Sequence, residues 1–381
     1  MVTAAAAGWW LGRWTFRRRS DPTVKGSTDA AFLRGVQLLL EDKPDKAIDT
    51  FIALMDVDDE SIETHFALGG LFRRRGEVDR AIRIHQNLIA RPTLLRAHRE
   101  QALFALAEDY LSAGLLDRAE SILVKLGDQS SRKADALWKL ADLYERQKDW
   151  NQAISARRRL PSTEESERII AHYFCELAEQ HQARGDMTAV RKALKSSQAG
   201  GAWLVRGALM RFSIALLDGD LKTARRLLKR IAETDARLLL EVWPQLTEAV
   251  ARTRGANPVD RFLGEIAARS ANCEMAITQI ALIHGDTDHA TVRKGIRAWI
   301  EQDGTLREWL LRLETVEGID ALDDAVLARL ADGLGALLRA RANYLCNECG
   351  YRADRLYWQC PSCRSWDQTR PNLTSKFGLS A

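Results

Sequence analysis

HFALGGLFRRRGEVDRAIRIHQNLI, which occupies residues 65–89, contains two amphipathic helical segments separated by a glycine. The first segment carries a small residue, Gly69, and the second carries Ala81 near its start. Two helices that cross closely need small residues at the crossing point, and Gly76 favours the left-handed turn that ends a helix. These residues therefore predict two packed helices joined by a tight turn.

The same pattern recurs along the chain with a period close to 34 residues. The small residue near the start of each second helix marks the copies: Ala47, Ala81, Ala119, Ala153, Val190 and Ala224, with spacings of 34, 38, 34, 37 and 34 residues. This period is typical of tetratricopeptide repeats. Because one repeat cannot bury its own apolar face, such repeats stack into a superhelix. A plain helical bundle, the alternative, would not repeat a small residue at a fixed spacing.

Four cysteines lie close together near the C-terminus, in the segment YLCNECGYRADRLYWQCPSCRSW. They form two Cys-x2-Cys pairs: Cys346, Cys349, Cys360 and Cys363. Two such pairs can surround one metal ion with four thiolates, as in structural zinc sites and rubredoxin-type iron sites. We expect one zinc ion, with iron as the alternative. The remaining cysteines, Cys175 and Cys273, are predicted to be buried thiols.

The sequence therefore predicts an all-α fold, a tetratricopeptide-repeat superhelix that ends in a small rubredoxin-like zinc ribbon. The repeats are expected at residues 28–235. Amphipathic helices continue over residues 236–342, where the small-residue pattern weakens, and we interpret them as degenerate repeats. The ribbon is expected at residues 343–371.

Residues 1–20 have the character of a membrane anchor. The first twelve residues are uncharged, and tryptophans and arginines follow them, an order typical of a helix that leaves a bilayer on the cytoplasmic side. Sixteen helical residues would span about 24 Å of a hydrocarbon core of roughly 30 Å. The favoured interpretation is a single-pass membrane anchor whose first residues are missing. A short interfacial helix and a cleaved signal peptide are the alternatives.

Composition and motifs argue against catalysis and against nucleic-acid binding. The sequence contains no glycine-rich phosphate loop, no nucleophile-elbow motif and no HExxH pair, and its formal net charge is only +4. We therefore expect an interaction protein that is not an enzyme and does not bind nucleic acid.

The first helices of the repeats should line the concave surface of the superhelix. On this basis we predict a protein-binding surface that contains Phe66, Arg73, Arg74, Phe104 and Trp138. Aromatic residues and arginine are effective interface anchors. The alternatives are that Phe66 and Phe104 belong to the core and that the run of arginines is a solvated face.

Three stretches resemble the lipopolysaccharide assembly protein B family of Gram-negative bacteria. They are GEVDRAIRIHQNLI at residues 76–89, HYFCELA at residues 172–178 and LYWQCPSCRSW at residues 356–366. The resemblance is dense over residues 32–193 and 344–371 and faint over residues 235–342. The four metal-binding cysteines of this family correspond to Cys346, Cys349, Cys360 and Cys363.

The resemblance implies an adaptor anchored in the inner membrane, with its repeats and ribbon on the cytoplasmic side. The implied partners are a membrane-bound ATP-dependent metalloprotease, the deacetylase of the lipid A pathway, and a membrane regulator that senses lipopolysaccharide. Presenting the deacetylase to the protease would limit lipopolysaccharide synthesis. The alternative function is that of a rubredoxin-type redox protein with a helical-repeat interaction domain.

Overall fold

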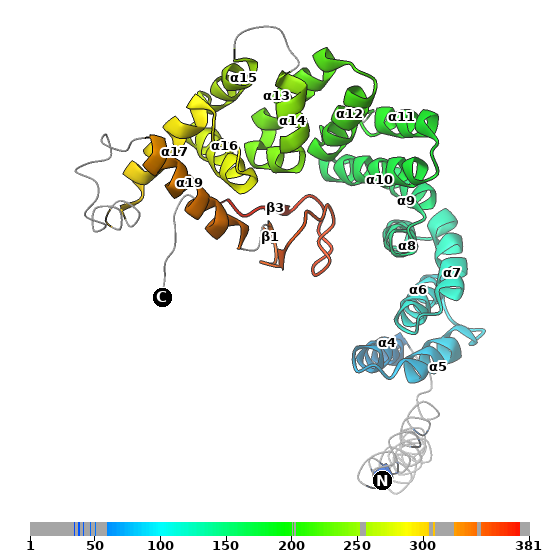
Figure 1. Ribbon diagram of the computed structural model, residues 1–381. Helices are drawn as coiled ribbons and strands as arrows, with labels where there is room; N and C mark the ends of the chain where they lie inside the picture. The colour runs from blue at the N-terminus through cyan, green and yellow to red at the C-terminus, as the bar shows by residue number, and fades with distance from the viewer. Residues whose placement is uncertain are drawn as a thin grey trace, which may run out of the picture. The chain divides into compact units, whose positions relative to one another are not determined.

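The computed structural model describes residues 59–199, 203–251, 257–304, 324–340 and 344–373, together with isolated positions elsewhere. The chain divides into two compact units, one that ends at Asp149 and one that begins at Trp150. Both units are built from helices, and short strands follow near the C-terminus (Figure 1). The predicted anchor at residues 1–20 and most of the first repeat copy lie outside the described residues.

In the first unit, each helix packs against the next helix along the chain. The helices are α4 (Asp59–Arg74), α5 (Val78–Ile89), α6 (Arg96–Ser112), α7 (Leu116–Gln129) and α8 (Lys133–Gln147). Residues 65–89 form most of α4 and all of α5, which are joined by a tight turn as predicted. The pairs of packed helices confirm the tetratricopeptide-repeat fold.

The small residues of the repeat pattern lie where helices meet. The residue near the start of each second helix is 0% exposed: Ala81, Ala119, Ala153, Val190 and Ala224. The turn glycines have positive φ angles of 82°, 74°, 77° and 73°: Gly76, Gly114, Gly185 and Gly219. In the fourth copy Lys148 takes this place with a φ of 58°. A side chain is less easily accommodated than glycine in this left-handed conformation.

Gly69 allows α4 and α5 to approach each other. A Cβ atom at this position would lie 2.5 Å from Cε1 and Nε2 of His85. That separation is far inside van der Waals contact, so the imidazole of α5 can pack on α4 only because residue 69 has no side chain. The sequence prediction that this crossing requires a small residue is confirmed.

The second unit begins with the remaining repeat helices. They are α9 (Trp150–Arg158), α10 (Glu164–Ala183), α11 (Met187–Ser196), α12 (Val205–Leu217) and α13 (Leu221–Asp235). Helix α10 packs on α11, and α12 packs on α13. Cys175 is completely buried in α10, as predicted, and burial raises the pKa of its thiol to about 12.

Helices continue beyond Asp235 and share one apolar core with α12 and α13. They are η1 (Ala236–Val242), α14 (Trp243–Ala251), α15 (Pro258–Ala267), α16 (Ala271–His284), α17 (Ala290–Gln302) and α19 (Asp324–Arg339). Trp243 and Trp299 are each 1% exposed within this core. Cys273, which was predicted to be buried, is only half-buried because it lies in the first turn of α16.

The C-terminal ribbon is a small antiparallel sheet. Its central strand β1 (Tyr344–Cys346) pairs with β2 (Arg352–Ala353) on one side and with β3 (Thr369–Pro371) on the other. Strand β3 lies against η1, so the ribbon rests on helices of its own unit (Figure 1).

Candidate metal centre and repeat surface

The four cysteines of the ribbon converge on one point. Their sulfur atoms all lie within 4.8 Å of one another, and the Sγ atoms of Cys346 and Cys363 are 3.8 Å apart. Those of Cys349 and Cys360 are 3.7 Å apart. A tetrahedral ion with metal–sulfur bonds of about 2.3 Å requires sulfur–sulfur edges of about 3.8 Å. The donor set therefore fits tetrahedral coordination of a metal ion.

Two matching turns carry the cysteine pairs. The amide of Gly350 donates to the carbonyl of Cys346 at 2.9 Å, and the amide of Arg364 donates to the carbonyl of Cys360 at 2.9 Å. Gly350 has a φ of 73° and Arg364 has a φ of 62°. The first turn uses glycine for the left-handed position, whereas the second places arginine in it.

The two thiols of the second turn lie in different surroundings. The Ser365 side chain, followed by the Ser365 backbone, lowers the pKa of the Cys363 thiol. Burial raises the pKa of the Cys360 thiol. Because a thiol that ligates a metal must be deprotonated, metal binding has to remove a proton from this buried cysteine.

Two tryptophans of the ribbon pack on repeat helices. The ring of Trp366 lies 5.0 Å from the ring of His172 in α10, 5.8 Å from Tyr173 and 6.3 Å from Trp150 in α9. Trp358 lies 6.3 Å from His172. The two tryptophans therefore cover the helices as well as the ribbon. We call the contact of Trp358 and Trp366 with Trp150, His172 and Tyr173 the ribbon seat. The position of Trp366 in the sequence did not indicate a contact so far away along the chain.

Polar contacts surround the ribbon seat. Arg168 pairs with Asp367 at 2.9 Å, and Arg370 contacts both Asp235 at 3.2 Å and Asp367 at 3.0 Å. The hydroxyl of Tyr344 also donates to Glu241. Arg370 is thus occupied by carboxylates of its own unit.

Arg206 of α12 borders the ribbon seat, where it lies beside Trp358. Its guanidinium is 3% exposed, pairs with Glu176 at 2.8 Å and Glu179 at 2.7 Å, and lies 5.9 Å from the ring centroid of Trp358. A charge this deeply buried requires such partners. Neither His172 nor Arg206 was among the sequence-predicted site residues, although HYFCELA does contain a polar residue within an apolar run.

His172 is a buried titratable residue of the ribbon seat. It is 1% exposed, and burial, followed by the charges of Arg206, Arg168 and Arg370, holds its pKa well below the ordinary value. The folded protein therefore keeps this imidazole neutral, while the unfolded chain protonates it below about pH 6.5. The contribution to stability is full above that pH and is lost as the pH falls towards the folded-state pKa.

We predict that the free energy of unfolding declines on acidification by up to about 1.4 kcal/mol per pH unit because of this residue. Urea unfolding at about pH 7.5 and 5.5 measures the decline. His172→Phe should flatten this pH dependence, with metal content followed in parallel because acid also protonates cysteine ligands. Identical pH slopes in the two proteins would contradict the assignment to His172.

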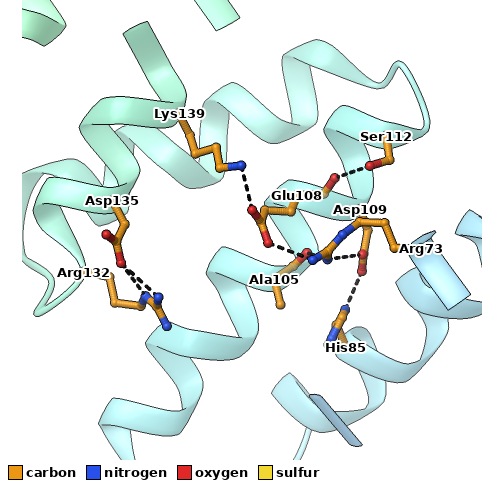
Figure 2. Close-up of polar contacts among 9 residues, drawn as sticks. All are labelled: Arg73, His85, Ala105, Glu108, Asp109, Ser112, Arg132, Asp135 and Lys139. Carbon is orange, nitrogen blue, oxygen red and sulfur yellow. Dashed lines mark hydrogen bonds and ion pairs between the residues drawn. The ribbon is translucent and has the colours of Figure 1, made fainter. Parts of the chain in front are cut away.

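In the first unit, a network of charges joins α4, α5, α6 and α8 (Figure 2). Arg73 contacts Asp109 at 2.8 Å and Glu108 at 2.9 Å, and Lys139 contacts the other oxygen of Glu108 at 2.7 Å. The second oxygen of Asp109 pairs with Nδ1 of His85, and both of these side chains are 0% exposed. The network therefore connects consecutive repeats through a fully buried carboxylate.

The residues predicted to bind partners are not equally available on this surface. Arg73 is occupied by the network, and Phe104 is buried under the guanidinium of Arg132, 4.7 Å from its ring centroid. Phe66 is half-buried and stacks on His85. Arg74 is exposed, and Trp138 is 49% exposed.

Helical repeats followed by a four-cysteine ribbon define a tetratricopeptide-repeat protein with a C-terminal metal-binding domain. The rubredoxin metal-binding domain family matches residues 344–371, and the tetratricopeptide-repeat family matches residues 64–98 and 135–161.

Relatives extend the likeness to nearly the whole chain. Lipopolysaccharide assembly protein B of Escherichia coli K12 is 31% identical over 97% of this chain and 96% of its own length. The protein of the same name from Haemophilus influenzae is 29% identical over 97% of this chain and 96% of its own length. A solved tetratricopeptide-repeat protein from Parabacteroides merdae superimposes with a TM-score of 0.33 and 12% identity over 73% of this chain and 99% of its own. The chain belongs to the lipopolysaccharide assembly protein B family.

Within the described part of the chain, no helix is both long enough and apolar enough to cross a bilayer. The predicted anchor at residues 1–20 lies outside that part.

Proposed function

We propose that this chain is a non-enzymatic adaptor that limits lipopolysaccharide synthesis. It would bring the deacetylase of the lipid A pathway to a membrane-bound ATP-dependent metalloprotease, while a membrane regulator that senses lipopolysaccharide controls this delivery. The observation that carries the proposal is the likeness to lipopolysaccharide assembly protein B over 97% of the chain. In this proposal residues 1–20 anchor the chain in the inner membrane, and the repeats and ribbon lie in the cytoplasm.

We further propose that the ribbon holds one zinc ion. Four thiolates with tetrahedral spacing leave no open coordination position, which is the arrangement of structural zinc sites. The ion would therefore organise the ribbon and perform no chemistry on a substrate. Iron in the same ligands would colour the purified protein red, so visible absorption together with metal analysis distinguishes this proposal from the redox alternative.

The partner-binding surface on the first unit is proposed to depend on Arg74 and Trp138. Both are exposed, on α4 and α8, whereas Arg73 is neutralised by carboxylates of the same unit. An exposed tryptophan and an exposed arginine suit a protein partner because these residues are common interface anchors.

We expect Arg74→Glu combined with Trp138→Ala to raise the cellular level of the deacetylase several-fold, because undelivered enzyme escapes proteolysis. Immunoblotting in the native host measures this level, with the variant as the sole copy. The matched control is Arg83→Glu combined with Leu115→Ala, which changes exposed residues of α5 and of the turn before α7. A folded double variant that leaves the deacetylase at its normal level would exclude this surface.

A further inference from the structure

Two neighbouring helices of the second unit carry basic residues on their outer faces. Helix α11 exposes Arg191, Lys192 and Lys195, and it contains no acidic residue between Met187 and Ser196. Helix α13 places five basic residues before its first acidic residue: Lys222, Arg225, Arg226, Lys229 and Arg230. The opposite side of each helix is buried, as Val190 and Leu228 show. The charges therefore lie on the outward side.

An open hollow of about 370 Å³ lies between the two helices. It is lined by Arg191 and Lys195 of α11, by Thr223 of α13 and by two carboxylates, Asp218 and Asp220. Arg191 also pairs at 2.8 Å with Asp218, which follows the end of α12 and precedes α13. We call the outward surface of α11 and α13 the basic face.

Part of the charge on the basic face is neutralised within the unit. Arg225 and Lys229 share Glu265, at 3.8 and 3.6 Å, and Arg191 is paired with Asp218. Within the described ranges no ion pair involves Lys192, Lys195, Lys222 or Arg226, although Asp220 lies close enough to Lys222 and Arg226 for their charges to act on its carboxylate. The cations of α11 and α13 outnumber the carboxylates beside them, so a positive field remains at this surface.

An exposed apolar side chain stands beside the basic face. Leu217, the last residue of α12, is 78% exposed and immediately precedes Asp218. Isolated exposed leucines are common, but Asp218, which follows this leucine, pairs with Arg191 of the basic face. An exposed leucine near a basic surface can insert into the boundary between headgroups and acyl chains.

We propose that the basic face docks on the surface of a bilayer that contains anionic phospholipid. Three of the cations on this face that form no ion pair in the described ranges are lysines, Lys192, Lys195 and Lys222, which act as hydrated point charges and suit a fluid array of headgroups. Contact through Lys192, Lys195, Lys222 and Arg226 would orient the second unit on the membrane. This inference does not depend on the adaptor role.

To test this, the full-length chain is treated with an acetylating reagent, and mass spectrometry measures the rate at which each lysine is acetylated. With vesicles of phosphatidylglycerol and phosphatidylcholine, acetylation of Lys192, Lys195 and Lys222 should slow at least about fivefold, the effect of roughly one cation's contact with an anionic surface. Vesicles of phosphatidylcholine alone should give no protection. Salt at about 1 M should abolish it, because the screening length falls to roughly 3 Å.

Charge-reversal variants distinguish binding through the basic face from binding through the basic N-terminal segment, because that segment has the same sequence in every variant. In Lys192→Glu combined with Lys222→Glu, protection of Lys195 should be lost. In the matched control, Lys125→Glu combined with Lys133→Glu, it should persist.

Three results would overturn the proposal: unchanged acetylation on anionic vesicles, equal protection by inorganic phosphate alone, or protection of Lys195 that survives the charge reversal.

Discussion

Replacing Cys349 with serine is expected to abolish metal binding and unfold the ribbon. Cys349 is exposed, so its loss leaves no cavity, and any structural effect has to arise from the lost ligand. Metal binding by such sites contributes about 10–16 kcal/mol of apparent free energy in small domains, where binding and folding are one process. The strands of the ribbon are only two or three residues long and cannot replace that energy.

The consequence should extend beyond the ribbon. An unfolded ribbon cannot hold Trp358 and Trp366 against His172, so the ribbon seat would be exposed to water. Metal analysis, limited proteolysis within residues 344–373 and tryptophan fluorescence measure the three effects. Cys273→Ser removes a half-buried thiol outside the metal centre and is the matched control. A Cys349→Ser protein that retains a full equivalent of metal would disprove the predicted ligand set.

The repeats and the metal centre could be predicted because their signals are local. A glycine at position 76 ends one helix, and Ala81 lies at the crossing within the same repeat, so both constraints act over a few residues. The same holds for the turns that carry the cysteines, where each pair spans four residues. Gly350 even fixes its own backbone conformation, with a φ of 73°.

The ribbon seat could not be predicted because its contacts join distant parts of the sequence. His172 and Trp366 are separated by 194 positions, and only the packing of α10 on the ribbon brings their rings to 5.0 Å. Trp358 and Trp366 lie beside the metal-binding cysteines in the sequence, yet their rings also pack on repeat helices. The pairing of Arg73 with Asp109 likewise joins consecutive repeats, and side-chain direction decides it.

Asp109→Ala is expected to destabilise the first unit by about 3–5 kcal/mol, because it leaves buried partners without their carboxylate. Asp109 is 0% exposed and accepts from Arg73, while its other oxygen pairs with His85. Denaturant unfolding measures the loss, with helicity by circular dichroism as the check that the variant folds. The effect should exceed that of most single substitutions in the unit.

Glu108→Ala provides the matched control. Glu108 precedes Asp109 on the same helix and contacts Arg73 at 2.9 Å and Lys139 at 2.7 Å, but 22% of its side chain is exposed. Water can solvate the cations that it leaves behind, so this variant should lose no more than about 1 kcal/mol. Arg73→Met added to Asp109→Ala should recover part of the stability, since the uncompensated charge is then removed as well. Equal losses for the two carboxylates, or no recovery in the double variant, would show that burial of Asp109 does not govern how the repeats hold together.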